Sequence, residues 1–195
     1  MKKMFTPFAA LSACLALCAA NAAPVDLDGM APASDEGFGR WYCGVSPGLL
    51  VFGRGVSANP AAYGAARFGY EHGRVLAFEF GGLAAPSVNP GKHGRRQWGG
   101  TGQLYGLHAD ALAHWDMYSR WFDPYLIGGA GVYGGSKPFF GNGRAAFAPR
   151  IGVGAMSHLA RRVSLRADAV ALRPACRGSN FAGSFEFALV WHFGE

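Results

Sequence analysis

The segment "SFEFALVWHF" (Ser184–Phe193) contains the clearest sign of the fold. Successive side chains of a β-strand point to opposite faces. One face of this segment would carry Phe185, Phe187, Leu189, Trp191 and Phe193. The other face would carry Ser184, Glu186, Ala188, Val190 and His192. This period-two alternation predicts a β-strand between an apolar environment and a mixed one.

Similar alternation recurs in "GLHADALAHW" (106–115) and "RVSLRADAVAL" (162–172). Together with apolar runs elsewhere, these patterns predict eight strands. The strands are expected at residues 41–53, 62–71, 75–84, 103–115, 122–134, 146–158, 162–173 and 184–193. The connections alternate in length: those near 72–74, 116–121 and 159–161 are short, and those near 54–61, 85–102, 135–145 and 174–183 are longer.

The composition of the 195 residues suits one β-rich domain. Apolar residues make up 50% of the chain, aromatic residues 14% and charged residues only 15%, against about 25% charged residues in an ordinary soluble domain. The 30 glycines disfavour long helices, because each interior glycine costs a helix about 1 kcal/mol relative to alanine.

The N-terminus has the features of a signal peptide. Two lysines precede an apolar stretch over residues 4–20, and Ala20-Asn21-Ala22 supplies small residues for cleavage. We therefore predict a signal peptide over 1–22, cleaved near Ala22, and a flexible acidic tail over 23–40. A lipoprotein is the alternative, because Leu11-Ser12-Ala13-Cys14 is similar to a lipobox.

Alternation does not by itself say which face of a barrel is buried, because soluble and membrane barrels put their apolar faces on opposite sides. Three features favour a membrane barrel. The strand segments 41–53 and 124–134 have no charged residue. The interior of an eight-stranded barrel is too narrow for so many aromatic side chains. Aromatic residues also crowd the strand ends, where membrane interfaces favour them: Trp41, Tyr42, Trp115, Tyr118, Trp121, Tyr125, Trp191 and Phe193.

The uncharged segment "FDPYLIGGAGVYGG" (Phe122–Gly135) is then predicted to be a membrane-spanning strand. The alternative is a buried strand of a soluble sandwich. In the membrane barrel we expect Tyr125, Ile127 and Tyr133 to face lipid. Gly128 and Ala130 would face inward and leave room for longer side chains of neighbouring strands.

Two prolines and two cysteines carry separate expectations. Pro47 and Pro149 lie inside predicted strands and lack a ladder donor, so bulges or strand ends are expected there. Cys43 and Cys176 remain after signal cleavage and would be in an oxidising compartment. They are predicted to lie at opposite ends of the fold, so we favour two unpaired thiols over a disulfide.

These features resemble the small outer-membrane β-barrels of the opacity-protein and OmpA-like class. The resemblance covers residues 41–193 and rests on the signal peptide, the eight strands and four segments: "FDPYLIGGAGVYGG", "PRIGVGAMSHL", "VSLRADAVAL" and "FEFALVWHF". It implies an all-β fold, an eight-stranded antiparallel up-and-down transmembrane β-barrel, in the outer membrane of a Gram-negative envelope. It also implies periplasmic termini, extracellular long loops, and lipopolysaccharide and the outer-membrane assembly machinery as partners.

With that orientation the charges of the long loops have one sign. The loops and their flanks contain no carboxylate and carry Arg54, Lys92, Arg95, Arg96, Lys137, Arg144, Arg173 and Arg177. The net charge of +6 includes two lysines of the signal peptide, which leaves about +4 after cleavage. The densest group, the basic patch, comprises Lys92, His93, Arg95, Arg96 and Trp98. It would neutralise lipopolysaccharide phosphates, or bind an anionic host glycan or a surface protein.

The mixed faces of the strands would line the lumen of the barrel. The charged residues expected there are Arg67, Glu79, His108, Asp110, Arg150, Arg166, Asp168 and Glu186. Three arginines thus face four carboxylates, and His108 can adjust the net charge of the group by gaining or losing a proton. Because unpaired buried charges are costly, we predict a nearly balanced ion-pair network that plugs the lumen. A gated ion path is the alternative.

No catalytic, metal or cofactor site is expected. A lipid deacylase would need serine, histidine and a carboxylate together on the lipid-facing rim. Ser157 and His158 are adjacent and point to opposite faces, and Ser87 has no carboxylate nearby. His108 and Asp110 make half of a catalytic or metal set and are better explained by the plug, and no cysteine–histidine spacing indicates a metal.

The resulting prediction is a structural and surface-interacting, adhesin-like protein that acts through its basic extracellular loops. A small, porin-like ion-conducting pore is the alternative, and a lipid A-modifying enzyme is a third and less favoured class. No nucleic-acid recognition motif accompanies the basic residues, so nucleic acid is not an expected partner.

Overall fold

The structure is a computed structural model that describes residues 39–53, 58–73, 75–90, 100–115, 122–137, 139, 145–160, 162–175 and 181–193. They contain eight strands: β1 (Arg40–Phe52), β2 (Ala61–His72), β3 (Leu76–Val88), β4 (Gly102–His114), β5 (Asp123–Gly135), β6 (Ala145–Ala160), β7 (Val163–Leu172) and β8 (Ala182–Phe193). The predicted segments agree with these strands to within two residues at every end but one, because β3 continues four residues further.

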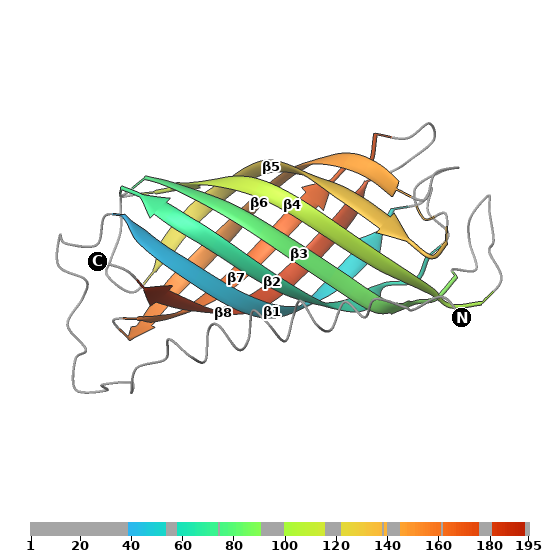
Figure 1. The fold of residues 1–195 in the computed structure, drawn as a ribbon, viewed down its shortest axis with the longest axis horizontal. Coiled ribbons are helices and arrows are strands. Elements are labelled where there is room, and N and C mark those ends of the chain that lie inside the picture. The colour runs from blue at the N-terminus through green and yellow to red at the C-terminus, as the bar shows by residue number, and fades with distance from the viewer. Residues whose placement is uncertain are drawn as a thin grey trace, which may run out of the picture.

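The eight strands form a closed barrel in which each strand pairs with its neighbours in the sequence. All eight pairings are antiparallel, including the pairing of β1 with β8 that closes the barrel. Figure 1 shows the strands running obliquely to the long axis. The predicted all-β up-and-down fold is therefore confirmed. β1 begins and β8 ends at one end of the barrel, the terminal rim, and we call the opposite end the loop rim.

Large apolar side chains cover the outside of the barrel, and charged side chains lie inside it. Phe187 on β8 is 65% exposed and Ile151 on β6 is 70% exposed, whereas the guanidinium-bearing Arg166 on β7 is only 2% exposed. The alternation predicted for the last strand is confirmed, with its phenylalanines outside. A soluble barrel would have the reverse arrangement, because its apolar face forms the core.

The prediction of which side chains of β5 face lipid and which face the lumen was wrong, because the two faces are reversed. Tyr125, Ile127 and Tyr133 are 1–2% exposed and lie inside the barrel. Leu126, Gly128, Ala130 and Val132 occupy the alternate positions, which include the exposed ones. The strand has apolar residues on both faces and no charge after Asp123, so its composition did not define the inner face. Tyr42, which was expected in the interfacial belt with Tyr125, is likewise buried at 1% exposure.

Both prolines remain within a regular register. Pro47 pairs with Gly64 of β2, and the β1–β8 pairing skips this position without a shift. Pro149 pairs with Ala130 of β5 and lies just beyond the last residue pair of β6 with β7. The prediction of a bulge at either proline was therefore wrong. The register shifts between Ala85 and Val88 of β3 and between His158 and Ala160 of β6 were not predicted.

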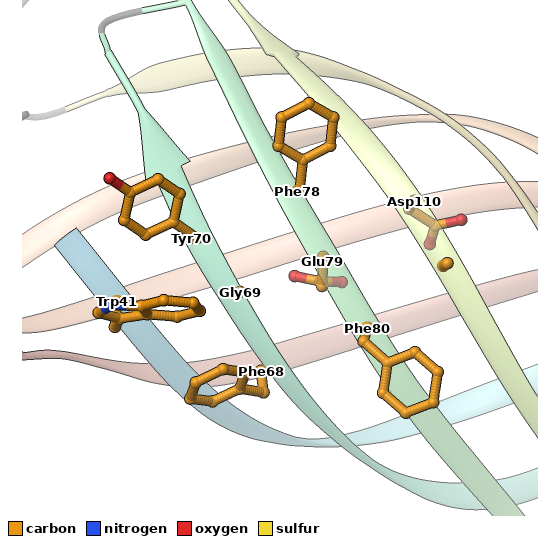
Figure 2. Close-up of a pocket in the computed structure, with 9 residues that line it drawn as sticks. Trp41, Phe68, Gly69, Tyr70, Phe78, Glu79, Phe80 and Asp110 are labelled. Carbon is orange, nitrogen blue, oxygen red and sulfur yellow. The ribbon is translucent and has the colours of Figure 1, made fainter. Parts of the chain in front are cut away.

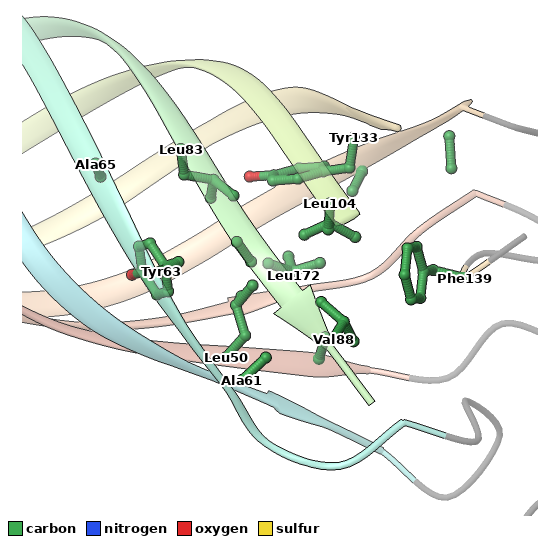
Figure 3. Close-up of a cluster of buried hydrophobic side chains, with 14 residues drawn as sticks. Leu50, Ala61, Tyr63, Ala65, Leu83, Val88, Leu104, Tyr133, Phe139 and Leu172 are labelled. Carbon is green, nitrogen blue, oxygen red and sulfur yellow. The ribbon is translucent and has the colours of Figure 1, made fainter. Parts of the chain in front are cut away.

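Two apolar clusters fill the lumen at different heights. The outer cluster lies toward the loop rim (Figure 3) and comprises Leu50, Ala61, Tyr63, Ala65, Leu83, Ala85, Val88, Leu104, Tyr133, Phe139, Ala146, Ala148, Leu172 and Ala182. Phe139, from the connection after β5, is 3% exposed and packs at this rim. The inner cluster comprises Tyr42, Ala77, Leu112, Tyr125, Ile127, Met156, Val170, Ala188 and Val190.

Within the described ranges there is no helix of the length and hydropathy that crosses a membrane. Cys43 is in a disulfide, so the prediction of an unpaired thiol was wrong for this residue. That prediction weighed only Cys176 as a partner, and the other cysteines lie outside the described residues.

Candidate functional site: the barrel lumen and its two rims

The centre of the lumen holds the eight ionisable residues expected there, which we call the ionic layer. They are 2–6% exposed and comprise Arg67, Glu79, His108, Asp110, Arg150, Arg166, Asp168 and Glu186. Each lies on the inward-facing positions of β2, β3, β4, β6, β7 or β8. Strand alternation therefore brings residues that are far apart in the sequence into one buried cluster.

Arg67 and Arg166 form the main part of the ionic layer. The guanidinium of Arg166 binds Glu79 at 2.5 Å and Asp168 at 2.8 Å. The guanidinium of Arg67 binds the same Asp168 at 2.8 Å and Glu186 at 2.8 Å. These pairs join β2 and β3 to β7 and β8 across the lumen. In a site that excludes water they are charge-assisted hydrogen bonds with little solvent screening.

A second branch of the ionic layer links β4, β5 and β6. Arg150 lies 3.1 Å from Asp110 and donates to the hydroxyl of Tyr133 at 2.5 Å. The Nε2 atom of His108 is 3.7 Å from the same carboxylate of Asp110. This branch contains one guanidinium, one carboxylate and one imidazole, so it is less densely paired than the branch around Arg166.

Four tyrosines inside the barrel were missed as lumen residues by the sequence reasoning. Tyr42 donates to Glu79 at 3.0 Å, and Tyr63 donates to Glu186 at 3.2 Å. Tyr125 donates to Asp168, and Tyr133 accepts the bond from Arg150. Each hydroxyl thus satisfies a buried charge while the ring adds to an apolar cluster.

Each of these tyrosines lies directly opposite a glycine on the neighbouring strand. The four residue pairs are Tyr42–Gly69, Tyr63–Gly48, Tyr125–Gly154 and Tyr133–Gly106. A Cβ atom added to any of the four glycines would collide with the tyrosine ring. The rings therefore lie over the glycines, which is a known way of covering glycine in a sheet. A tyrosine and glycine on adjacent strands is the sequence signal that would have revealed this arrangement.

The terminal rim carries a separate group of hydrogen-bonded residues. The Oγ atom of Ser164 is 2.9 Å from Nε2 of His192 and 2.8 Å from Nδ1 of His158. The Nδ1 atom of His192 is 3.3 Å from Oε1 of Glu71, and the guanidinium of Arg40 is 3.2 Å from Oε2 of the same carboxylate. Serine, histidine and glutamate thus occur in the order of a hydrolase triad. Ser164 is 0% exposed, so no substrate reaches its hydroxyl in this conformation.

This rim group differs from the pairs that the sequence suggested. His158 contacts Ser164 of the next strand, not its neighbour Ser157. Strand alternation alone places Ser164 and His192 on inward faces, so their meeting was predictable from the strand register. His114 and Asp123 form a further pair at this rim, with 2.6 Å between the imidazole and the carboxylate.

A shallow groove lies on the outer face of β1, β2 and β3, near the terminal rim (Figure 2). Its walls are the rings of Trp41, Phe68, Tyr70, Phe78 and Phe80. The indole of Trp41 stacks on Phe68 at 5.0 Å and contacts Tyr70 at 4.7 Å between ring centroids. These aromatic residues form part of the apolar exterior near one end of the barrel, where membrane interfaces favour them.

The loop rim is described only in part. The basic patch of Lys92, His93, Arg95, Arg96 and Trp98 lies outside the described residues. Among the other cations predicted for this rim, Arg173 is exposed and its guanidinium lies 5.5 Å from the ring centroid of Phe181.

The chain has the fold of the small outer-membrane β-barrels. Neisserial surface protein A is similar over 78% of this chain and 97% of its own length, with 14% identity and a TM-score of 0.63. The N-terminal barrel domain of Pseudomonas aeruginosa OprF is similar over 80% and 99%, with 11% identity and a TM-score of 0.54. The Yersinia pestis protein Ail, in complex with the heparin analogue sucrose octasulfate, is similar over 80% and 99%, with 11% identity and a TM-score of 0.51.

No family model matches the chain, and no curated protein sequence matches it. At identities of 11–14%, the likeness to the solved structures shows the fold alone. The predicted resemblance to eight-stranded outer-membrane barrels is confirmed at that level.

Proposed function

We propose that this protein resides in the outer membrane and acts as a structural, adhesin-like surface protein through its loop rim. The terminal rim would face the periplasm, with both chain ends there after cleavage near Ala22. The loop rim would face the exterior and contact lipopolysaccharide. The apolar exterior supports this location, because a water-facing sheet would leave side chains such as Phe80 and Phe185 more than half exposed to solvent.

The filling of the lumen by buried side chains is the observation that carries the proposal. Along β3, β4, β6 and β8 the charged residues lie between residues of the inner cluster and residues of the outer cluster, so buried charged and apolar side chains follow one another along these strands. An eight-stranded barrel is only wide enough to be filled by its own side chains. A barrel that is closed in this way supports interaction through its ends and its outer surface better than transport through its axis.

The basic patch supports an anionic partner. Its cations are on the longest loop and have no carboxylate near them in the sequence. Guanidinium groups bind sulfate and carboxylate in a bidentate manner, which suits sulfated or sialylated glycans. The solved complex of Ail with a heparin analogue shows that a barrel of this fold binds a sulfated sugar, and we extend that binding mode to this chain as part of the proposal.

The glycan-binding role predicts a strong effect of charge reversal in the basic patch. The double substitution Arg95→Glu/Arg96→Glu is expected to weaken binding of expressing cells to immobilised heparin by at least about tenfold, equivalent to 1.4 kcal/mol. Two favourable contacts with sulfate would become repulsive. Binding is measured over a series of salt concentrations, and the difference should shrink as salt screens the charges.

The matched control is Arg161→Glu/Arg162→Glu, which makes the same change of charge in the two residues that the sequence places between β6 and β7. It is expected to leave heparin binding within about twofold of the unchanged protein. Equal loss in the two double variants would indicate a general effect of net charge. No loss in the patch variant would remove the glycan proposal while leaving the fold and the location intact.

A conductance measurement separates the proposed role from the pore alternative. The purified chain in planar bilayers is expected to give no steady openings, because two apolar clusters interrupt the axis of the lumen. Steady openings that are abolished by substitutions in the ionic layer would support the pore and contradict the argument from the filled lumen.

A further inference from the structure

We propose that the ionic layer contains a metal site in which Glu79, His108 and Asp110 bind one divalent transition-metal ion of the Zn²⁺ class. The sequence reasoning expected no metal. Glu79 of β3 and Asp110 of β4 are directly opposite each other in the strand register, and His108 is two residues from Asp110 on the same inward face. One ligand atom from each residue lies within 4.8 Å of the other two. All three side chains are buried.

Ligand atoms of this group are not used by the surrounding network. Within the part of the chain that the structure describes, the Nδ1 atom of His108 and the Oδ1 atom of Asp110 are buried and have no hydrogen-bond partner. Their residues are 6% and 5% exposed. Buried polar atoms without a partner are rare in folded proteins, and each costs about 1–3 kcal/mol. A cation bound among Glu79, His108 and Asp110 would give this incompletely paired group a further partner.

Glu79 also has an oxygen that is available to a metal. Its Oε2 atom accepts bonds from Tyr42 at 3.0 Å and from Arg166 at 2.5 Å. Its Oε1 atom lies 3.5 Å from the guanidinium of Arg67, which is a longer contact than those of Oε2. Asp110 is used in the same way, because Arg150 binds its Oδ2 atom at 3.1 Å and leaves Oδ1 unpaired. The guanidinium groups therefore bind mainly one oxygen of each carboxylate, and neither carboxylate is fully used by the arginines.

Glycines on the neighbouring strand positions leave room for these ligands. Gly81 of β3 is opposite His108, and Gly129 of β5 is opposite Asp110. A Cβ atom at Gly81 would collide with the imidazole, and one at Gly129 would collide with the carboxylate of Asp110. Side chains at these two positions would thus displace both proposed ligands.

Charge and ligand type indicate which ion would bind. The ionic layer has three guanidinium groups and four carboxylates, so with a neutral imidazole it favours a cation over an anion. One imidazole nitrogen and two carboxylate oxygens suit Zn²⁺ and related transition metals, whereas Ca²⁺ and Mg²⁺ favour oxygen ligands alone. Three protein ligands leave a position for water, as in many zinc sites.

The test uses the full chain without a polyhistidine tag, folded in detergent and treated with a chelator. Zn²⁺ is added either during refolding or after it, because the site is buried, and free metal is removed by gel filtration. Elemental analysis is expected to give one zinc per folded chain in at least one of the two preparations. X-ray absorption at the zinc edge is expected to show one imidazole nitrogen with oxygen ligands and no sulfur.

Two ligand variants and one control locate the ion. His108→Gln and Asp110→Asn are each expected to weaken zinc binding by at least about tenfold, since even indirect contacts of metal sites have effects of that size. His192→Gln removes another buried histidine outside the proposed site and should retain the zinc. Folding of every variant is checked by the change in gel mobility on boiling, so that loss of metal is not confused with loss of fold.

The proposal is overturned by the absence of stoichiometric zinc in both preparations of the unsubstituted chain. It is also overturned if both ligand variants keep full affinity, or if the absorption spectrum shows sulfur or several imidazoles. Because the spectrum is recorded on the unsubstituted chain, the result does not depend on the folding of any variant.

Discussion

The substitution Arg166→Met is expected to lower the free energy of unfolding of the barrel by about 3–5 kcal/mol. Methionine fills a similar space but leaves Glu79 and Asp168 without the guanidinium that binds both. Arg166 is 2% exposed, so water cannot replace the lost contacts at little cost. The measurement is reversible urea unfolding in detergent micelles or lipid vesicles, followed by tryptophan fluorescence.

Arg173→Met serves as the control for this prediction. Arg173 lies just beyond β7 at the loop rim, is exposed, and contacts the ring of Phe181. Its replacement is expected to cost no more than about 1 kcal/mol. A similar small cost for Arg166→Met would mean that the ionic layer contributes little to stability, and the plug role would have to be abandoned.

A second substitution distinguishes lost packing from unpaired charge. Adding Asp168→Asn to Arg166→Met removes one of the carboxylates that the first substitution left without its main partner. The double variant is expected to be more stable than the sum of the two single effects by about 0.5–3 kcal/mol. Additive effects would indicate that the cost of Arg166→Met comes from packing alone.

The second large effect is expected at Gly69. Gly69→Val should lower the free energy of unfolding by about 3 kcal/mol, because its side chain would occupy the space of the Tyr42 ring. Tyr42 is 1% exposed and donates to Glu79 at 3.0 Å, so a displaced ring also loses a charge-assisted hydrogen bond. The same unfolding measurement applies.

Gly64→Val on the same strand is the matched control. A Cβ atom at Gly64 meets nothing within 4 Å, and valine suits a strand better than glycine does. We expect a change within about 0.5 kcal/mol. A double-mutant cycle of Gly69→Val with Tyr42→Ala should be strongly non-additive. Equal losses at Gly64 and Gly69 would refute the role of the tyrosine–glycine pairs.

Sequence patterns predicted most of the fold because several strands have clearly different faces. In β8, bulky rings alternate with residues that include Glu186 and His192, and in β7 Arg166 and Asp168 lie on one face. A charged residue within the membrane-spanning part of a barrel strand has to point inward. Because side chains alternate along a strand, one such residue defines which side chains of the whole strand face the lumen. The inward position of the whole ionic layer follows from this rule.

β5 shows where the same reasoning fails. It has no charge beyond Asp123 at its start, and both of its faces are apolar. Tyrosine suits a membrane interface and also a polar interior, because it has an apolar ring and a hydroxyl. The tyrosines of β5 point inward because their hydroxyl groups bind residues of other strands: Tyr125 binds Asp168 of β7, and Tyr133 binds Arg150 of β6. Contacts that a strand makes with other strands cannot be read from that strand alone.

Which arginine binds which carboxylate inside the ionic layer could not be predicted from the sequence either. Counting charges predicted near balance, but it did not predict that Arg67 and Arg166 share Asp168. Nor did it predict that atoms of His108 and Asp110 remain without hydrogen bonds. Such details depend on the strand stagger, which sets the heights at which side chains from opposite walls meet.

The connections made by Arg67 bear on how the chain is assembled. Arg67 of β2 binds Glu186 of β8, and Ser46 of β1 donates to the same Glu186 at 3.0 Å. These bonds require the first and last strands to be adjacent. A half-assembled sheet inside lipid would expose these groups without their partners, at a cost of several kcal/mol for each charge. We therefore expect the sheet to be nearly complete and curled before it enters the bilayer. The pairing of β1 with β8 and the insertion of the barrel would then occur together.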